Sequence, residues 1–213
     1  KTTFKYEIPY MLLITAVLLV MGMTGNEITF IEGVILWILF IAYLLYLYIL
    51  AKKGNDSGDE QSVKLYPVWK CLLFIVLGGV CVVIGSQFVV NGATTIARAC
   101  GMSERFIGLT IVAFGTSLPE LVTSVSAARK GNAGIAIGNI VGSNIFNILF
   151  VVGTVALICP VPFESRFVID TVVAILCGVL LWGGTIRHKE LRKPCGVVML
   201  LCYAAYFVYL AAM

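Results

Sequence analysis

The chain is divided into seven apolar runs, each long enough to cross a lipid bilayer, by short polar segments. The runs cover residues 7–23, 29–51, 67–97, 105–128, 133–158, 165–186 and 194–212. A transmembrane helix needs about 20 apolar residues. Only 12% of the residues are charged, whereas a soluble domain carries about 25%. Because water-soluble helices need a polar face, which these runs lack, we predict an all-α integral membrane protein with seven transmembrane helices.

The distribution of basic residues predicts the orientation of these helices. If the N-terminus is cytoplasmic, only Arg98, Arg105 and Arg166 of the fifteen Lys and Arg residues fall on the outer side. This bias is the one expected of a correct helix count, because Lys and Arg accumulate in cytoplasmic loops. The polar segment 52–66 is then a cytoplasmic linker, loop 187–193 is also cytoplasmic, and His188 in that loop is a surface residue.

Seven cysteines are scattered through the chain without the spacing of a disulfide framework or a metal site. They are Cys71, Cys81, Cys100, Cys159, Cys177, Cys195 and Cys202. Most lie inside apolar runs, where a cysteine behaves as a small hydrophobic residue. We therefore expect buried thiols rather than disulfides or metal ligands.

The first two runs resemble the last two at an offset of 163 residues. The matching pairs are Glu7 with Asp170, Gly33 with Gly196, Val34 with Val197, Ala42 with Ala205, Tyr43 with Tyr206, and Leu47 with Leu210. The two pairs of helices enter the membrane from opposite sides, as in the inverted repeats of secondary transporters. Residues 67–158 have no partner in this chain, so we expect three further helices before Lys1 in the parent protein. Residues 1–51 would then end an N-terminal half, and residues 67–213 would form a C-terminal half of five helices, giving a ten-helix (5+5) fold.

The segment GTSLPE, residues 115–120, places a carboxylate near the middle of an apolar run. Thr116 and Ser117 precede Glu120 by four and three residues, so the three side chains share one helix face. Pro119 cannot donate a backbone hydrogen bond to the carbonyl of Gly115, and this should break the helix and free carbonyl oxygens. An intramembrane carboxylate with hydroxyls and carbonyls around it is typical of a site for a hard cation. The alternative is a structural kink with Glu120 paired to an arginine, but no basic residue lies at mid-span.

The next run carries a second set of polar residues, namely Asn139, Ser143, Asn144 and Asn147. Asn139, Ser143 and Asn147 recur every four residues and form one stripe. We expect Ser143 and Asn147 to contact the cation, whereas Asn144 could simply join helices by hydrogen bonds. Gly138 and Gly142 form a small-xxx-small pair that permits close approach of another helix.

The run 67–97 also contains polar residues, Ser86, Gln87 and Asn91. They could line an entry path for an ion or satisfy one another at a helix interface. The sequence leaves both possibilities open.

The stretches GLTIVAFGTSLPELVTS and GNIVGSNIFNILFVVG resemble the second alpha repeat of the calcium/cation antiporter superfamily, and look most like the prokaryotic sodium/calcium exchangers. The resemblance covers residues 105–153 directly. It implies that two antiparallel alpha repeats hold one cation cluster, with the carbonyl of Ala113 and the side chains of Thr116, Ser117, Glu120, Ser143 and Asn147 as ligands. It implies ligand roles for Asn139 and Asn144 less directly, and a sliding role for the helix at 67–97. Some members of the superfamily carry Asp where this chain has Asn147.

The resemblance therefore implies a transporter and not an enzyme, with no catalytic residues and no cofactor. We expect a secondary antiporter that exchanges Na⁺ for Ca²⁺ by alternating access across the plasma membrane, here without its first alpha repeat. Its partners would be these ions, the lipid bilayer and the missing N-terminal three-helix segment, and no nucleic acid. The alternatives are a Ca²⁺/H⁺ or K⁺-dependent exchanger, and a non-transporting subunit of a membrane assembly.

Overall fold

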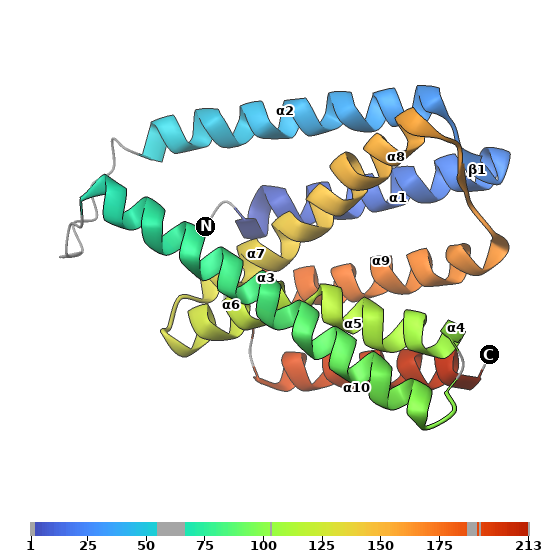
Figure 1. Ribbon diagram of the computed structural model, residues 1–213. Coiled ribbons are helices and arrows are strands. Elements are labelled where there is room, and N and C mark those ends of the chain that lie inside the picture. The colour runs from blue at the N-terminus through green and yellow to red at the C-terminus, as the bar shows by residue number, and fades with distance from the viewer. Residues whose placement is uncertain (1–2, 55–66, 103, 187–190, 192, 213) are drawn as a thin grey trace. The chain divides into compact units, whose positions relative to one another are not determined.

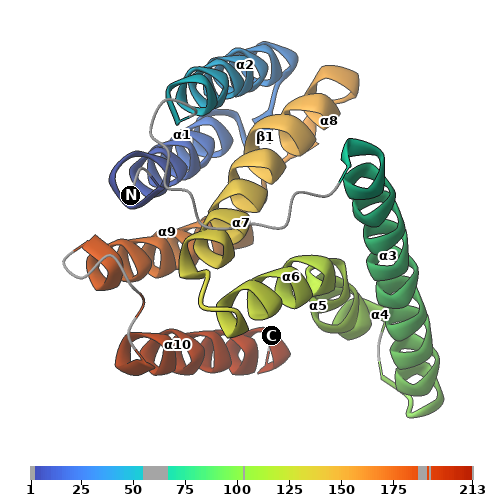
Figure 2. The ribbon, with the colours of Figure 1, turned by 90° about the vertical axis from the view of Figure 1, so that its left-hand side faces the viewer.

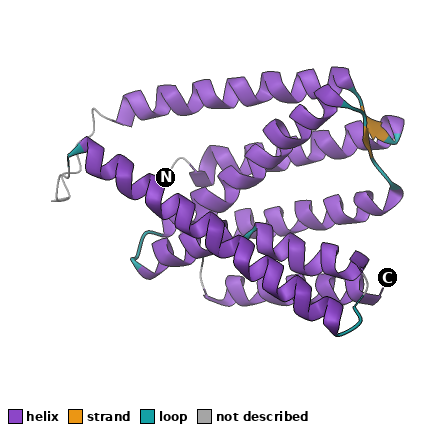
Figure 3. Ribbon diagram, viewed as in Figure 1, coloured by secondary structure: helices purple, strands orange, loops and turns teal. Residues whose placement is uncertain are grey.

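The computed structural model describes residues 3–54, 67–102, 104–186, 191 and 193–212, which fold into two compact units. Unit 1 comprises Lys1–Asp59 with Ala133–Leu200, and unit 2 comprises Glu60–Asn132 with Leu201–Met213. Apart from one short ribbon of two strands, the regular structure is helical (Figure 3). His188 and most of the predicted linker 52–66 and loop 187–193 lie outside the described residues.

Unit 1 is built from α-helices with two π-helical stretches. A π-helical turn η1 (Thr3–Glu7) leads into α1 (Ile8–Gly25), and α2 (Phe30–Gly54) follows. The chain then continues through α7 (Ala133–Phe146), a π-helical stretch η3 (Asn147–Val152), α8 (Gly153–Ile158) and α9 (Ser165–Ile186). The first part of α10 (Lys193–Ala212) also belongs to this unit. Figures 1 and 2 show α7 and α8 running on as one long rod beside α1 and α2.

The core of unit 1 forms where α2 packs on α8 and α1 packs on α9. One face of α7 and η3 contributes Ile137, Val141, Ile145 and Leu149, which recur every four residues and are all buried. Helices α2 and α8 approach closely at Gly33, because a Cβ there would lie only 2.9 Å from the Cβ of Ala156. The close contact allows these helices to pack by van der Waals attraction, which replaces the hydrophobic effect as the force between helices in lipid.

A ribbon of two short antiparallel strands, which the sequence did not reveal, joins two turns of unit 1. Strand β1 (Glu27–Ile28) pairs with β2 (Val161–Pro162), and Glu27 stands opposite Pro162. Asn26 ends α1 with a positive φ of 56°, a conformation that asparagine adopts more readily than most residues. Its carbonyl accepts a hydrogen bond of 2.7 Å from the backbone N–H of Phe163. The ribbon therefore fixes the α1–α2 turn against the α8–α9 turn.

Unit 2 consists of one long helix and one broken helix, joined by a short turn. The long helix is α3 (Val68–Ala99), and the broken one comprises α4 (Glu104–Ile107), the π-helical turn η2 (Gly108–Val112), α5 (Ala113–Thr116) and α6 (Leu118–Arg129). Helix α3 packs against η2, α5 and α6. The unit is completed by the second part of α10.

The helices agree with the predicted apolar runs in position. Five helices in the described part are long and apolar enough to span a membrane, namely Lys5–Gly25, Phe30–Lys52, Val68–Ala99, Ala133–Ile158 and Ser165–Ile186. A bent pair, Thr110–Thr116 with Leu118–Arg129, qualifies as a sixth span, and Lys193–Tyr209 is a shorter apolar helix. The last of these corresponds to the seventh predicted run, so the count of seven stays a prediction.

The prediction of buried cysteines is wrong for five of the seven. All seven are free thiols in the structure, and only Cys177 and Cys195 are partly covered by the chain. The physical reason is that helices such as α3 expose apolar side chains on most of their surface. In a membrane protein such a surface is compatible with lipid, so an apolar run does not imply burial inside the protein.

Candidate cation-binding site

The helix that carries the GTSLPE segment is broken where the proline predicts. The two parts, Thr110–Thr116 and Leu118–Arg129, meet at an angle of 51°. Ser117 is the residue between them, and its N–H donates to the carbonyl of Phe114 over 3.1 Å, a tighter turn than in an α-helix. Pro119 occupies the first turn of α6, where the missing N–H removes no helical bond. The predicted break is therefore confirmed.

Three of the predicted ligand oxygens lie together at this break. The hydroxyl of Thr116 donates to the carbonyl of Ala113 over 3.0 Å, and the hydroxyl of Ser117 donates to the same carbonyl over 3.4 Å. A hydroxyl that donates one hydrogen bond keeps lone pairs that can accept from, or coordinate, another group. The break thus places hydroxyl and carbonyl oxygens within one turn of the chain.

Glu120 lies in the first turn of α6, directly after the break, and is partly buried. A helix N-terminus carries a partial positive charge, which attracts a negatively charged side chain. The turn is held by Thr123, whose hydroxyl donates to the carbonyls of Pro119 and Glu120 at 2.9 and 3.0 Å. The break therefore also creates the helix terminus on which the carboxylate sits.

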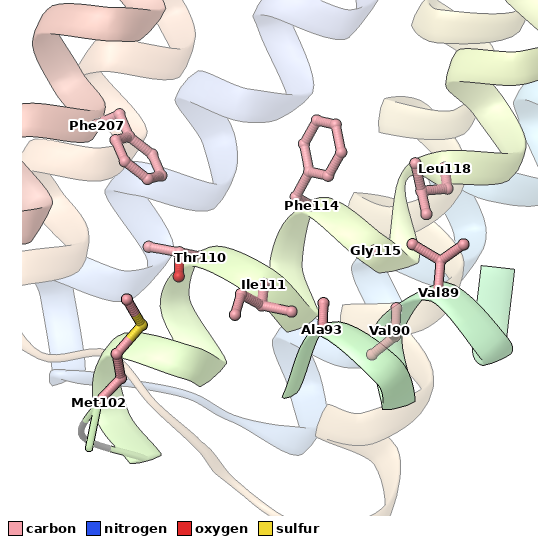
Figure 4. Close-up of a pocket in the computed structure, with 10 residues that line it drawn as sticks. All are labelled: Val89, Val90, Ala93, Met102, Thr110, Ile111, Phe114, Gly115, Leu118 and Phe207. Atoms are coloured by element: carbon pink, nitrogen blue, oxygen red, sulfur yellow. The ribbon is translucent and has the colours of Figure 1, made fainter. Parts of the chain in front are cut away.

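The glycine of the GTSLPE segment has a packing role that the sequence did not reveal. Gly115 is buried, and a Cβ at this position would overlap the side chain of Val90 on α3. Figure 4 shows Val89, Val90 and Ala93 of α3 beside Phe114, Gly115 and Leu118, which line one cavity of about 470 Å³ in unit 2. Apart from Thr110, its lining is apolar. The glycine of the motif was the only sequence signal for this contact, because the partner on α3 is an ordinary valine.

The second polar set forms a stripe on α7 and η3. Asn139, Ser143 and Asn147 are offset by two residues, about 200° around a helix, from the buried stripe that ends at Leu149. They therefore face away from the core of unit 1; Asn139 and Ser143 are partly buried and Asn147 is exposed. Asn147 is also the first residue of η3, and π-helical turns occur frequently at functional sites.

Asn144 lies beside this stripe but points elsewhere. Its side-chain amide donates to the carbonyl of Ile140 on the same helix over 2.9 Å. The structure thus engages Asn144 within its own helix and not in the hydrogen bond between helices that was the alternative for this residue.

The predicted close helix approach at Gly138 and Gly142 is not formed by the described residues. No atom in the described part of the chain lies within 4 Å of a Cβ built on either glycine, whereas Gly33 and Gly153 are in close contact with neighbouring helices. The described residues of unit 1 therefore provide no close helix neighbour for the small-xxx-small spacing of Gly138 and Gly142.

The polar residues of α3 are mostly turned to its own backbone or to its surface. The hydroxyl of Ser86 donates to the carbonyl of Val82 over 2.8 Å, and Gln87 and Asn91 are exposed. Thr94, which the sequence analysis did not single out, has a buried hydroxyl without a hydrogen-bond partner among the described residues. These positions leave both earlier interpretations of the α3 polar residues open.

The chemistry of the candidate site is that of oxygen ligands with a single carboxylate. The described residues contain no group of three or more His, Cys, Asp and Glu side chains that could hold a metal ion. The structure assembles Ala113, Thr116 and Ser117 in unit 2, and it aligns Ser143 with Asn147 in unit 1. Such neutral oxygens suit hard cations that must be released again.

Comparison with known proteins gives a consistent match. The sequence model described as "Sodium/calcium exchanger protein" matches residues 70–212. The chain is 34% identical to the putative antiporter CaxA of Alkalimonas amylolytica, over 96% of this chain and 67% of that protein. It is 38% identical to the sodium/calcium exchanger MaX1 of Methanosarcina acetivorans, over 66% of this chain and 41% of that protein.

The fold is also similar to a solved structure, that of a sodium/calcium exchanger from Methanococcus jannaschii. The TM-score is 0.78 with 30% sequence identity, and the match covers 98% of this chain and 65% of that one. The chain thus spans about two thirds or less of the length of each of these three proteins.

Proposed function

This chain belongs to the sodium/calcium exchanger family, and on that premise we propose that it forms the larger part of an antiporter that exchanges Na⁺ for Ca²⁺. It is a multi-pass membrane protein of a transporter family, and we place its action at the plasma membrane. The transported ions are its substrates, so the proposal needs no resident cofactor.

The observation that carries the proposal is the group of oxygens at the break between α5 and α6. Thr116 and Ser117 hold their hydroxyls at the carbonyl of Ala113, and Glu120 adds a carboxylate one turn later. Ca²⁺ and Na⁺ prefer oxygen ligands, and Ca²⁺ gains more from a carboxylate because it carries twice the charge. A site of this kind binds both ions at overlapping positions, so that loading one ion expels the other.

Ser143 and Asn147 are the further ligands that we propose from unit 1. Their stripe faces away from the core of that unit, and both side chains carry an oxygen of the kind that hard cations prefer. Asn147 contributes a neutral amide oxygen where some members of the superfamily have a carboxylate. This lowers the negative charge of the proposed site and keeps H⁺ or K⁺ coupling as the alternative form of exchange.

The internal repeat supports the proposal that a second set of ligands comes from outside this chain. The residue pairs that match at an offset of 163, among them Gly33 with Gly196 and Tyr43 with Tyr206, lie in α2 and α10. The segment from α3 to α8 has no counterpart at this offset. We propose that its counterpart is a three-helix segment with a first alpha repeat in the full-length protein, which would complete two halves of five helices.

Alternating access requires an element that opens the ion site to one side of the membrane at a time. We propose α3 for this role, because it packs against both parts of the broken helix and touches Gly115 through Val90. Movement of α3 along that contact would change access to the oxygens of the neighbouring turn.

Radioactive Ca²⁺ uptake into vesicles that contain the full-length protein tests the proposal. Uptake that depends on an outward Na⁺ gradient supports Na⁺/Ca²⁺ exchange. Uptake driven by a pH gradient without Na⁺ would replace it with Ca²⁺/H⁺ exchange, and a requirement for K⁺ would add that ion. No uptake under any gradient would favour the non-transporting subunit.

A further inference from the structure

A second cavity lies in unit 1, and none of its residues belongs to the proposed ligand set. The cavity measures about 320 Å³ and forms between the start of α1 and the middle of α2. Its polar lining consists of one carboxylate and four phenol rings, Glu7 with Tyr6, Tyr10, Tyr43 and Tyr46. The surface of this cavity is mostly apolar, as in unit 2, but its lining includes a carboxylate, and this points to a ligand that is both cationic and partly apolar.

Glu7 is a buried carboxylate. Only 8% of its surface is exposed, because the turn η1 packs against α1, α7 and α9. Neither of the two ion pairs formed within the described residues involves Glu7. The amine of Lys5 lies 5.3 Å from the centre of the Tyr6 ring. A buried carboxylate that forms no ion pair is costly, so a cation from outside the described residues would stabilise it.

The tyrosine rings beside Glu7 form a stacked wall. Tyr10 and Tyr43 stack with ring centres 5.5 Å apart and planes 12° from parallel, and Tyr46 lies 6.3 Å beyond Tyr43. The hydroxyl of Tyr10 donates to the carbonyl of Leu39 over 3.0 Å, which fixes its ring. The hydroxyl of Tyr46 is buried and has no hydrogen-bond partner among the described residues. A buried hydroxyl of this kind is normally satisfied, by protein, water or a ligand.

We propose that this cavity binds the alkylammonium group of a zwitterionic phospholipid. Aromatic faces attract ammonium and quaternary ammonium groups, and the carboxylate of Glu7 supplies the opposite charge. A bare metal ion fits less well, because it needs several oxygen ligands, whereas rings make up most of the polar lining. Glu7 also lies at the start of the candidate span Lys5–Gly25, the depth at which headgroups meet the hydrocarbon core.

Native mass spectrometry of the full-length protein tests this proposal. The protein is mixed with equal amounts of phosphatidylethanolamine, which carries an amine, and phosphatidylglycerol, which does not. We expect the wild type to retain the ethanolamine lipid preferentially. Glu7→Gln should reduce this preference about tenfold, and Tyr43→Leu, which removes one ring, about threefold or more. Tyr46→Phe should reduce it less, because the ring remains.

The matched control is Glu27→Gln, which removes an exposed carboxylate at the other end of α1. It should leave the lipid preference unchanged. If Glu7→Gln does not fold, as judged by size-exclusion chromatography, the two tyrosine variants decide the question. Free phosphoethanolamine added at excess distinguishes the source of the amine: displacement of the lipid by the soluble compound would show that the headgroup alone is sufficient.

Two results would overturn the proposal. One is equal retention of the two lipids by the wild type, which is also expected if another segment of the full-length protein fills the cavity. The other is an unchanged lipid preference in both Glu7→Gln and Tyr43→Leu.

Discussion

Two helices of this chain, one in each unit, carry polar side chains inside an apolar span, but their backbones differ. The helix of unit 2 breaks at Ser117 and turns by 51°, whereas α7, η3 and α8 of unit 1 continue as one candidate span, Ala133–Ile158. The difference follows from Pro119, since the other helix has no proline within its span.

The difference teaches how a membrane helix can hold a charge. A break creates a new helix N-terminus, and its partial positive charge stabilises a carboxylate in the next turn. The broken helix accordingly carries Glu120, whereas the polar side chains of the continuous one, among them Asn139, Ser143 and Asn147, are all neutral. Variants on the two helices can test whether this division of roles is correct.

Removing the charge of the broken helix should have the largest effect. Glu120→Gln keeps the size of the side chain but removes its charge, and attraction to a divalent ion is screened less in a low-dielectric site than in water. We expect Ca²⁺ affinity of the full-length protein to fall at least about 100-fold, and Na⁺ affinity to fall less. Isotope binding and flux measurements in vesicles would show this.

The matching variant on the continuous helix is Asn147→Ala, which removes a neutral ligand and should have a smaller effect than Glu120→Gln. Glu27→Gln controls for the loss of a carboxylate elsewhere. If Asn147→Ala reduced Ca²⁺ affinity as much as Glu120→Gln, the proposed division between a charged and a neutral helix would be wrong. Wild-type flux in Glu120→Gln would eliminate the ligand role of this residue.

A Gly→Ala substitution should destabilise the protein more in the broken helix than in the continuous one. A Cβ at Gly115 overlaps Val90, so Gly115→Ala should destabilise the protein by about 1–3 kcal/mol. Gly142 has open space in the described structure, so Gly142→Ala should change stability by no more than about 1 kcal/mol. Thermal unfolding of both variants in the same detergent makes the comparison.

Val90→Ala should restore part of the stability lost in Gly115→Ala, because it makes room for the added methyl group. If Gly115→Ala left the stability of the protein unchanged, the contact with α3 would be loose. A strongly destabilising Gly142→Ala would reveal that a helix of the full-length protein packs on that face, as the small-xxx-small spacing originally suggested.

The hydroxyls of the broken helix should matter more than the amide that is engaged within α7. Ser117→Ala removes one of the two hydroxyls at the Ala113 carbonyl, and we expect Ca²⁺ affinity to fall about tenfold. Asn144→Ala removes a side chain that bonds to its own helix and should change affinity less than about twofold. Titration of Ca²⁺ binding measures both. Equal losses in the two variants would contradict the assignment of Asn144 to a structural role.

Loss of the ion pair in the turn before the broken helix should have the smallest effect on the protein. Arg98 forms two charge-assisted hydrogen bonds of 2.6 and 2.8 Å with Glu104, and these lower the pKa of Glu104 below the ordinary value of 4.5. The contribution to stability is therefore present above pH 4.5 and is lost as the pH falls through the lowered pKa. A carboxyl titration by ¹³C NMR should give a lower pKa in the wild type than in Arg98→Gln. The same pKa in both proteins would show that the ion pair is not formed in solution.

The sequence by itself determined the helices and the backbone break. Twenty-residue apolar runs and Pro119 act within a single segment, so their consequences do not depend on what lies beside them. For the same reason the hydroxyls of Thr116 and Ser117, one turn from Ala113, could be expected near its carbonyl. The ligand roles themselves remain predictions, because they depend on groups that must meet across separate segments.

Only the tertiary structure decided which faces are covered. It placed Val90 against Gly115, paired the turn at Asn26 with the strand before Phe163, and brought no other described segment of unit 1 close to Gly138 and Gly142. The sequence could not show these contacts, because all faces of an apolar helix carry the same kinds of residues. An apolar helix face is equally stable against lipid and against another helix, so hydrophobicity does not distinguish the buried face from the exposed one. Shape and backbone hydrogen bonds make that choice, and both require the neighbouring segment to be in place.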